Sequence, residues 1–262
     1  MRSGFNLAAF KTPLFFLATC LVIGVVWHLL IKVFAIPPYL VPEPPTVLEG
    51  ALANSGVLAS RTAFTLTSGL LGLALSTVLA AAVAGLYVAF PRAEQASMPI
   101  VLAFRSAPVA AVAPIIMMML GRGISASILV VVIVSIFPLL INLMRGMRAA
   151  EPTTLELLHV YNASIWQQLR YVRLPSAMPY LFTGLRIAGT TALLGAMLSE
   201  WITGSRGLGL LILDSGEMRD IALLWAAVLL SILLALSMFW ITSSLEQRLS
   251  RWRRVGAAGL SS

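Results

Sequence analysis

Few side chains in this sequence could carry out chemistry. The histidines are His28 and His159, and the single cysteine is Cys20. A zinc protease needs two histidines and an acid on one helix, and a serine hydrolase needs a Gly-x-Ser-x-Gly turn; the sequence contains neither pattern. One thiol forms neither an internal disulfide nor a thiolate metal cluster. We therefore predict no catalytic residue and no metal site.

Glu200 is the acidic residue whose position in the sequence most requires an explanation. It lies in the segment LLGAMLSEWITG, near the end of an apolar run, where an ionised carboxylate is costly unless it reaches water, an interface or a basic partner. One interpretation makes it an interfacial group beside Trp201 in an aromatic belt. The other makes it a pore or gate residue that contacts Arg206 or another span. The sequence leaves both open.

Three further residues are candidates for the same pathway. Gly207 and Gly209 form a pair too short to indicate nucleotide binding, and they favour a turn that lets the chain bend back toward a pore. Met118 belongs to a run of three methionines that resembles a soft pore lining, although lipid-facing or helix-packing methionine is the more common role.

The composition indicates that much of the chain is surrounded by lipid. Apolar residues make up 59% of it, charged residues 11%, and its mean hydropathy is +0.94, which predicts a polytopic membrane protein. The net charge of +8 does not indicate nucleic-acid binding, because the basic residues lie at the ends of apolar runs.

Apolar runs able to cross about 30 Å of hydrocarbon predict about six membrane-spanning helices in an all-α fold. The runs are Pro13–Ile36, Thr62–Phe90, Ala107–Leu120, Ile124–Met144, Tyr180–Ile202 and Ile221–Ser243. The third is short and contains Pro108 and Pro114, so we expect a broken or tilted helix there, with Pro91–Ser106 lying partly along the membrane interface.

The distribution of basic residues predicts the orientation. With the N-terminus inside, thirteen of the 18 Lys and Arg residues face the cytoplasm, which places both termini there. The predicted domains are an N-terminal helix with an outer loop (1–61), a core (62–245) containing a polar cytoplasmic loop (145–179), and a basic cytoplasmic tail (246–262) suited to anionic lipid.

The polar loop 145–179 interrupts a chain otherwise built for lipid. A helix is expected from Thr153 to Tyr161, with Glu156 three residues after Thr153 as in a capping box. Asn162 then accepts a left-handed backbone. A second helix is expected from Ser164 to Arg173, ended by Pro175. Two short helices joined by a bend predict a compact knob that docks on a partner, through the face that carries Leu155, Leu158 and His159.

The loop resembles the cytoplasmic EAA loop of bacterial ABC importer permeases. The matching positions are Glu156, Asn162, Val172, Leu174 and Pro175. The segments FRSAPVAAVAPIIMMMLGRG and SEWITGSRGLGLLI resemble the branch that carries nitrate, sulfonates, taurine and pyrimidine precursors. Two departures stand out: Leu157 and Leu158 replace two alanines, and Asn162 replaces a glycine. We expect coupling to survive them with altered affinity.

The resemblance implies the type I ABC importer permease fold and a set of partners. These are a second permease copy, here taken as a homodimer, a cytoplasmic ABC ATPase dimer and an extracytoplasmic binding protein, in a bacterial inner membrane. ATP and Mg would bind to the ATPase, because neither Lys11 nor Lys32 follows a glycine as a phosphate-binding loop requires. Coupling to the ATPase would involve Glu156, Leu157, Leu158, His159, Asn162, Ala163 and Pro175.

The cargo and two other function classes stay open. The resembling branch suggests a nitrate-, sulfonate- or taurine-like anion, or a pyrimidine- or riboflavin-type precursor. A non-enzymatic membrane scaffold would keep the spans without a solute path. An ion-coupled secondary transporter would need buried acids within the spans, and Glu200 is the clear candidate for that role.

Overall fold

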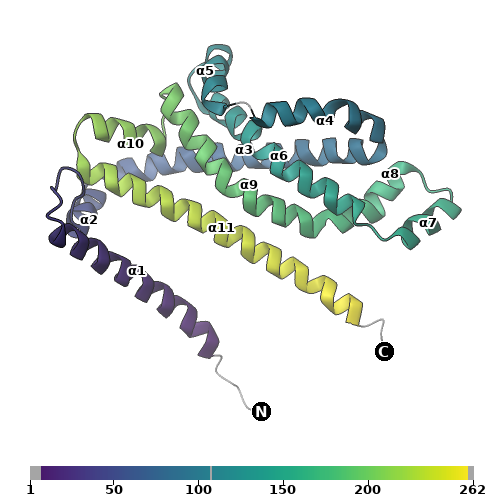
Figure 1. Ribbon diagram of the computed structural model, residues 1–262, viewed down its shortest axis with the longest axis horizontal. Helices are drawn as coiled ribbons and strands as arrows, with labels where there is room; N and C mark the ends of the chain where they lie inside the picture. Colours follow the sequence, from purple (N-terminus) through teal and green to yellow (C-terminus); the bar gives the residue numbers. More distant parts are fainter. Residues whose placement is uncertain (1–6, 107, 259–262) are drawn as a thin grey trace. The chain divides into compact units, whose positions relative to one another are not determined.

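The computed structural model describes residues 7–106 and 108–258, and every regular element within these ranges is a helix (Figure 1), which confirms the all-α fold class. The elements are α1 (Leu7–Val33), α2 (Pro44–Ala53), α3 (Ser55–Ala89), α4 (Pro91–Ser106), α5 (Val109–Leu120), α6 (Ile124–Arg148), α7 (Pro152–Val160), α8 (Ile165–Gln168), the π-helical turn η1 (Leu169–Arg173), α9 (Leu174–Thr203), α10 (Leu208–Glu217) and α11 (Ile221–Ala258). Arg2 of the charge count and the end of the predicted tail 246–262 lie outside the described residues.

Four helical runs of the described chain are long and apolar enough to cross a membrane. They are Ser55–Ala89, Ile124–Arg148, Ile165–Thr203 and Ile221–Glu246, and they fall on four of the six predicted spans. The first predicted span falls on α1, which contains the apolar segment Leu21–Val33. The third falls on α5, a helix of only 12 residues with Pro114 inside it, so the expected short helix is confirmed.

The chain divides into two compact units, of which the first comprises residues 1–58 and 212–229. Within it Trp27 and Trp225 stack at 5.4 Å between ring centroids, and the Trp225 indole donates to the Leu40 carbonyl at 3.2 Å. Lys32 Nζ lies 2.9 Å from Glu43 Oε1, and this hydrogen bond lowers the pKa of the Glu43 carboxyl. The segment after α1 is therefore folded back and fixed by aromatic and ionic contacts.

The second unit comprises residues 59–211 and 230–262, and α6 packed along α9 is its centre. Leu139, Leu140 and Leu143 of α6 are almost completely buried in its core, which also receives side chains from α3, α9 and α11. A smaller cluster joins Ala113 and Ile116 of α5 to α6. Burial of this apolar surface holds the unit together within the protein, while its outward side chains remain apolar enough for lipid.

Small residues bring α6 and α9 close together near the end of α6. A Cβ atom added at Gly146 would lie 2.7 Å from the Ala177 Cα atom and 2.8 Å from the Tyr180 Cβ atom. Ala177 is itself fully buried. The two backbones approach at this point because neither residue carries a larger side chain, as is usual where membrane helices pack tightly.

Two predictions about the polar loop were wrong. Thr153 caps nothing, because α7 already begins at Pro152 with Glu151 as the N-cap residue. Proline suits the first helical position, since its φ angle is pre-set and that position needs no N–H donor.

Pro175 does not end the second helix either, because α8 continues through η1 into α9. In η1 the Leu174 N–H donates to the Leu169 carbonyl, five residues back, and Pro175 then occupies the first turn of α9, where proline is tolerated.

We predict that Gly146→Ala destabilises the protein although alanine favours helices. The added methyl group meets the Ala177 Cα atom and the Tyr180 side chain of α9, and such overpacking costs about 1–3 kcal/mol. Gly85→Ala is the matched control, because a Cβ atom at Gly85 has nothing within 4 Å. Thermal unfolding in detergent should show a lower midpoint for Gly146→Ala and an unchanged or higher midpoint for Gly85→Ala. Equal midpoints would contradict the close approach of α6 and α9.

Candidate functional site

The polar loop forms a helical hairpin, residues 151–168, which we call the coupling hairpin. It extends beyond the ends of α6 and α9 (Figure 1). Asn162 turns the chain with φ of +53°, which confirms the predicted left-handed conformation. The Asn162 N–H donates to the His159 carbonyl at 3.0 Å and the Ala163 N–H to the Leu158 carbonyl at 2.9 Å. This is the Schellman pattern, so the last carbonyls of α7 are satisfied within the turn.

The second arm of the hairpin starts with a capping box that sequence reasoning missed. The Gln167 N–H donates to Ser164 Oγ at 3.3 Å, and the Ser164 N–H donates to Gln167 Oε1 at 2.7 Å. The signal was present in the sequence as Ser-x-x-Gln. Both arms are therefore terminated by local hydrogen bonds, which makes the hairpin a defined shape rather than a loose loop.

Apolar side chains gather on the exposed surface of this hairpin. Val160 is 77% exposed, Tyr161 76% and Trp166 78%, and Leu157 and Ile165 are also exposed. We call these five residues the docking patch. Such a group on a polar segment indicates a surface that a partner covers.

The predicted docking residues divide between this patch and the inside of the hairpin. Glu156, Leu157 and His159 are exposed, whereas Leu158 and Ala163 are half-buried. Leu155 is half-buried as well, so the face expected from Leu155 and Leu158 turns partly inward. Helical spacing could not predict which side of the hairpin the face with Leu155 and Leu158 would take, and its role in docking stays a prediction. Pro175 is exposed and lies in α9, outside the hairpin.

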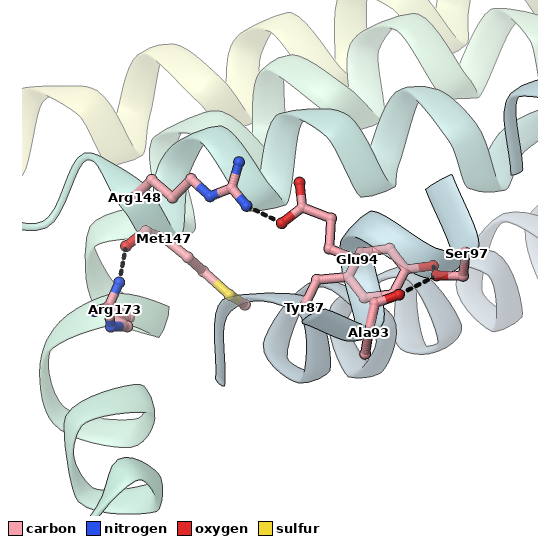
Figure 2. Close-up of polar contacts among 7 residues, drawn as sticks. All are labelled: Tyr87, Ala93, Glu94, Ser97, Met147, Arg148 and Arg173. Carbon is pink, nitrogen blue, oxygen red and sulfur yellow. Dashed lines mark hydrogen bonds and ion pairs between the residues drawn. The ribbon is translucent and has the colours of Figure 1, made fainter. Parts of the chain in front are cut away.

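Polar contacts fix the base of the hairpin to the helices beneath it (Figure 2). Arg173 Nη1 donates to the Met147 carbonyl at 3.4 Å and so joins η1 to the end of α6. Arg148, the last residue of α6, forms an ion pair with Glu94 of α4. The two ends of the hairpin are thus held to each other and to α4. Neither contact could be predicted from the sequence, since 26 and 54 residues separate the partners.

Glu200 is the centre of a second polar cluster. Its side chain is fully buried, and Oε2 accepts hydrogen bonds from the Thr65 hydroxyl at 3.1 Å and the Gly209 N–H at 2.9 Å. The Leu208 N–H donates to Thr65 Oγ1 at 2.9 Å. The cluster therefore joins α3, α9 and the first turn of α10. The hydrogen bonds of Glu200 are with α3 and α10 rather than with Arg206, and the choice between an interfacial role and a pore role stays a prediction.

Gly207 and Gly209 are required by the close approach of this turn to Glu200 and its helix. A side chain at Gly207 would overlap the Glu200 carboxylate, and one at Gly209 would overlap the Met197 carbonyl oxygen. The Gly209 amide, in the first turn of α10, can reach the carboxylate because both positions lack a Cβ atom.

Three of the four predicted pore or gate residues therefore meet, and the fourth does not join them. Met118 is 84% exposed on α5. Thr65 is the member of the cluster that sequence reasoning missed; the only available signal was a hydroxyl residue within an apolar run, which is common in membrane helices. Within the described residues, no three His, Cys, Asp or Glu side chains gather as a metal site would require.

We predict that Thr65→Val loosens the start of α10. Valine has nearly the same shape, but it leaves the buried Leu208 N–H without an acceptor and removes one donor to Glu200, at a cost of about 1–3 kcal/mol. Thr67→Val is the control, because the Thr67 hydroxyl contacts only the Ala63 carbonyl of its own helix. Thermal unfolding and hydrogen exchange of the α10 amides should respond to Thr65→Val alone. Equal responses to both substitutions would contradict the cluster.

Comparisons with known proteins identify the family. Residues 76–251 match the model of the family described as binding-protein-dependent transport system inner membrane component. The riboflavin transport system permease protein RibX of Chloroflexus aurantiacus is 31% identical, with 89% of this chain and 88% of that protein covered. The formylaminopyrimidine transport permease protein ThiX of Halalkalibacterium halodurans is 29% identical, with 94% and 97% covered.

A solved structure shares the fold at low sequence identity. A chain of the MetNI methionine ABC transporter, in an inward-facing conformation, is similar with a TM-score of 0.61 at 17% identity, covering 73% of this chain and 93% of that one. The chain therefore belongs to the family of binding-protein-dependent transport system inner membrane components, and it is a multi-pass permease component of an ABC importer.

Proposed function

We propose that two copies of this chain form the membrane pathway for a small solute, and that the docking patch of each copy binds a cytoplasmic ABC ATPase. An external binding protein delivers the solute. ATP and Mg bind to the ATPase, and this chain turns the movement of the ATPase into a change of its spans. The two alternative classes, scaffold and ion-coupled transporter, find no support in the family of the chain.

The observation that carries the proposal is the docking patch itself. Exposed Val160, Tyr161 and Trp166 lie on a hairpin between two helical runs that can span a membrane, Ile124–Arg148 and Ile165–Thr203. A segment that is outside lipid and yet presents large apolar side chains needs a protein partner to cover them. The excess of basic residues on this side supports a cytoplasmic position for the hairpin and for both termini.

The packing below the patch supports a mechanical role. The hairpin is continuous with α6 at one end and with η1 and α9 at the other, and these helices are in close contact at Gly146 and Ala177. The bond from Arg173 to the Met147 carbonyl adds a second link there. A force on the patch therefore displaces α6 and α9 together, which is the rigid-body movement that alternating access requires.

The Glu200 cluster supports a role in the outer half of the pathway. Glu200, Gly207 and Gly209 hold the first turn of α10 against α9 and α3. When α9 moves with the hairpin, this turn moves with it. Exposed Met118 on α5 would face lipid or the second copy of the chain.

The cargo we propose is a small solute of the kinds named for the relatives. Those names include riboflavin, formylaminopyrimidine and taurine. Proteoliposomes that contain this chain, its ATPase and its binding protein should take up one of these three compounds when ATP is supplied to the ATPase side. Uptake of none of them would contradict the cargo but not the docking of the ATPase.

We predict that Val160→Asp releases the ATPase. A carboxylate in the covered patch loses its water without gaining a partner, and a loss of about 1.4 kcal/mol or more weakens binding about ten-fold or more. Val160→Thr is the control, since threonine has a similar shape and no charge. Co-purification and titration of the detergent-solubilised complex measure the affinity. Both variants should unfold at the wild-type temperature because Val160 is exposed. Undiminished binding by Val160→Asp would remove the docking patch from the interface.

A further inference from the structure

An ion pair joins helix α4 to the base of the coupling hairpin, beside apolar packing of Ala93, Met98 and Val101 on the core. The pair joins Glu94, in the first turn of α4, to Arg148, the last residue of α6 (Figure 2). The Glu94 side chain is only 18% exposed and that of Arg148 is 50% exposed. Glu94 is also the only acidic residue in the sequence of α4, so no neighbour on that helix can replace it.

The same end of α4 is fixed to α3 by hydroxyl groups. Ser97 Oγ lies 2.5 Å from the Tyr87 hydroxyl and 2.7 Å from the Ala93 carbonyl oxygen (Figure 2). Tyr87 is almost completely buried in the main core. The start of α4 is therefore held in place, with the Glu94 carboxylate directed toward Arg148.

The position of Arg148 gives the ion pair its significance. Arg148 ends α6 only four residues before α7 begins, so a displacement of the hairpin reaches this guanidinium at once. The ion pair transmits this displacement to Glu94 and therefore to α4. Helix α4 precedes α5, whose Ala113 and Ile116 pack against Ala126 and Val130 of α6. Helix α5 thus packs on α6 and follows α4 in the sequence, so a joint movement of α4 and α6 would involve α5 as well.

We propose that Glu94 is a positioning residue for coupling, which ties α4 to the hairpin so that α4 follows when the ATPase moves it. This inference rests on the proposed function. A partly exposed ion pair contributes little to stability, so its loss should leave the fold and the docking patch intact while it removes the direct link between α4 and Arg148. This separation between stability and coupling makes the inference testable.

The test uses the complete complex with its ATPase in nanodiscs and needs no knowledge of the cargo. Spin labels are placed at Ala96 of α4 and Thr153 of α7, both exposed, in a Cys20→Ser background diluted with unlabelled chains. Distances are measured without nucleotide and after trapping with ATP, Mg and vanadate. The variants are Glu94→Arg, Arg148→Glu and the double charge exchange, with Gln95→Arg, an exposed neighbour, as the matched control.

In the wild type and in Gln95→Arg, we expect the distance between the labels to be the same in both states, because α4 and the hairpin move together. Each single charge reversal should shift or broaden the distance on trapping, at unchanged ATPase affinity and unfolding temperature. The double exchange restores the ion pair with its sign reversed and should restore the constant distance.

Three outcomes would overturn the inference. The first is a wild-type distance that changes on trapping while the ATPase binds normally, which leaves the proposed function standing. The second is a double exchange as impaired as the single variants, which means that the charges act separately. The third is a wild-type complex that binds no ATPase, and this result overturns the proposed function as well.

Discussion

The close packing of α6 on α9 at Gly146 and Ala177 is the constraint on which the rest of the account depends. Helices in lipid gain little from burying apolar surface against each other, so their association relies on close contact and on polar links. Gly146 permits that contact at the end of the spanning region, and the bond from Arg173 to the Met147 carbonyl closes it. A hairpin with such a base moves as part of two spans. Without this packing, the docking patch would lie on a flexible loop, and a movement of its partner would not displace α6 and α9.

Two polar clusters connect this pair of helices to other helices, one near the hairpin and one at the other end of α9. Near the hairpin, Arg148 and Glu94 connect α6 to α4. At the other end of α9, Glu200 connects α9 to Thr65 and to the Gly209 amide of α10. A buried carboxylate with amide and hydroxyl donors is costly to disturb, whereas a half-exposed ion pair is not. The Glu200 cluster therefore suits a fixed joint, whereas the Glu94–Arg148 pair can be removed by substitution at little cost to the fold.

Local signals in the sequence predicted the helices better than the contacts between them. The apolar runs predicted the spans, and the basic residues predicted an orientation. Asn162 predicted the left-handed turn, because only a few residue types accept that conformation. The start of α7 and the effect of Pro175 were misjudged because the effect of a proline depends on its position within a helix. The partners of Glu200 and Arg148 lie 135 and 54 residues away, and no periodicity reports pairs at such separations. For the same reason the sequence could not predict which face of α7 is exposed.

The most direct test of the central claim is a photo-cross-link from the hairpin to its partner. A photoreactive amino acid at Val160 would be compared with one at Met118, a residue of similar exposure on α5. We expect Val160 to cross-link to the ATPase, with a yield that persists in nucleotide-free and vanadate-trapped complexes, because the hairpin stays docked while it moves. Met118 should give no ATPase adduct. An ATPase that cross-links to neither position, or to Met118 instead, would contradict the account of the hairpin as the point where the ATPase acts on the membrane helices.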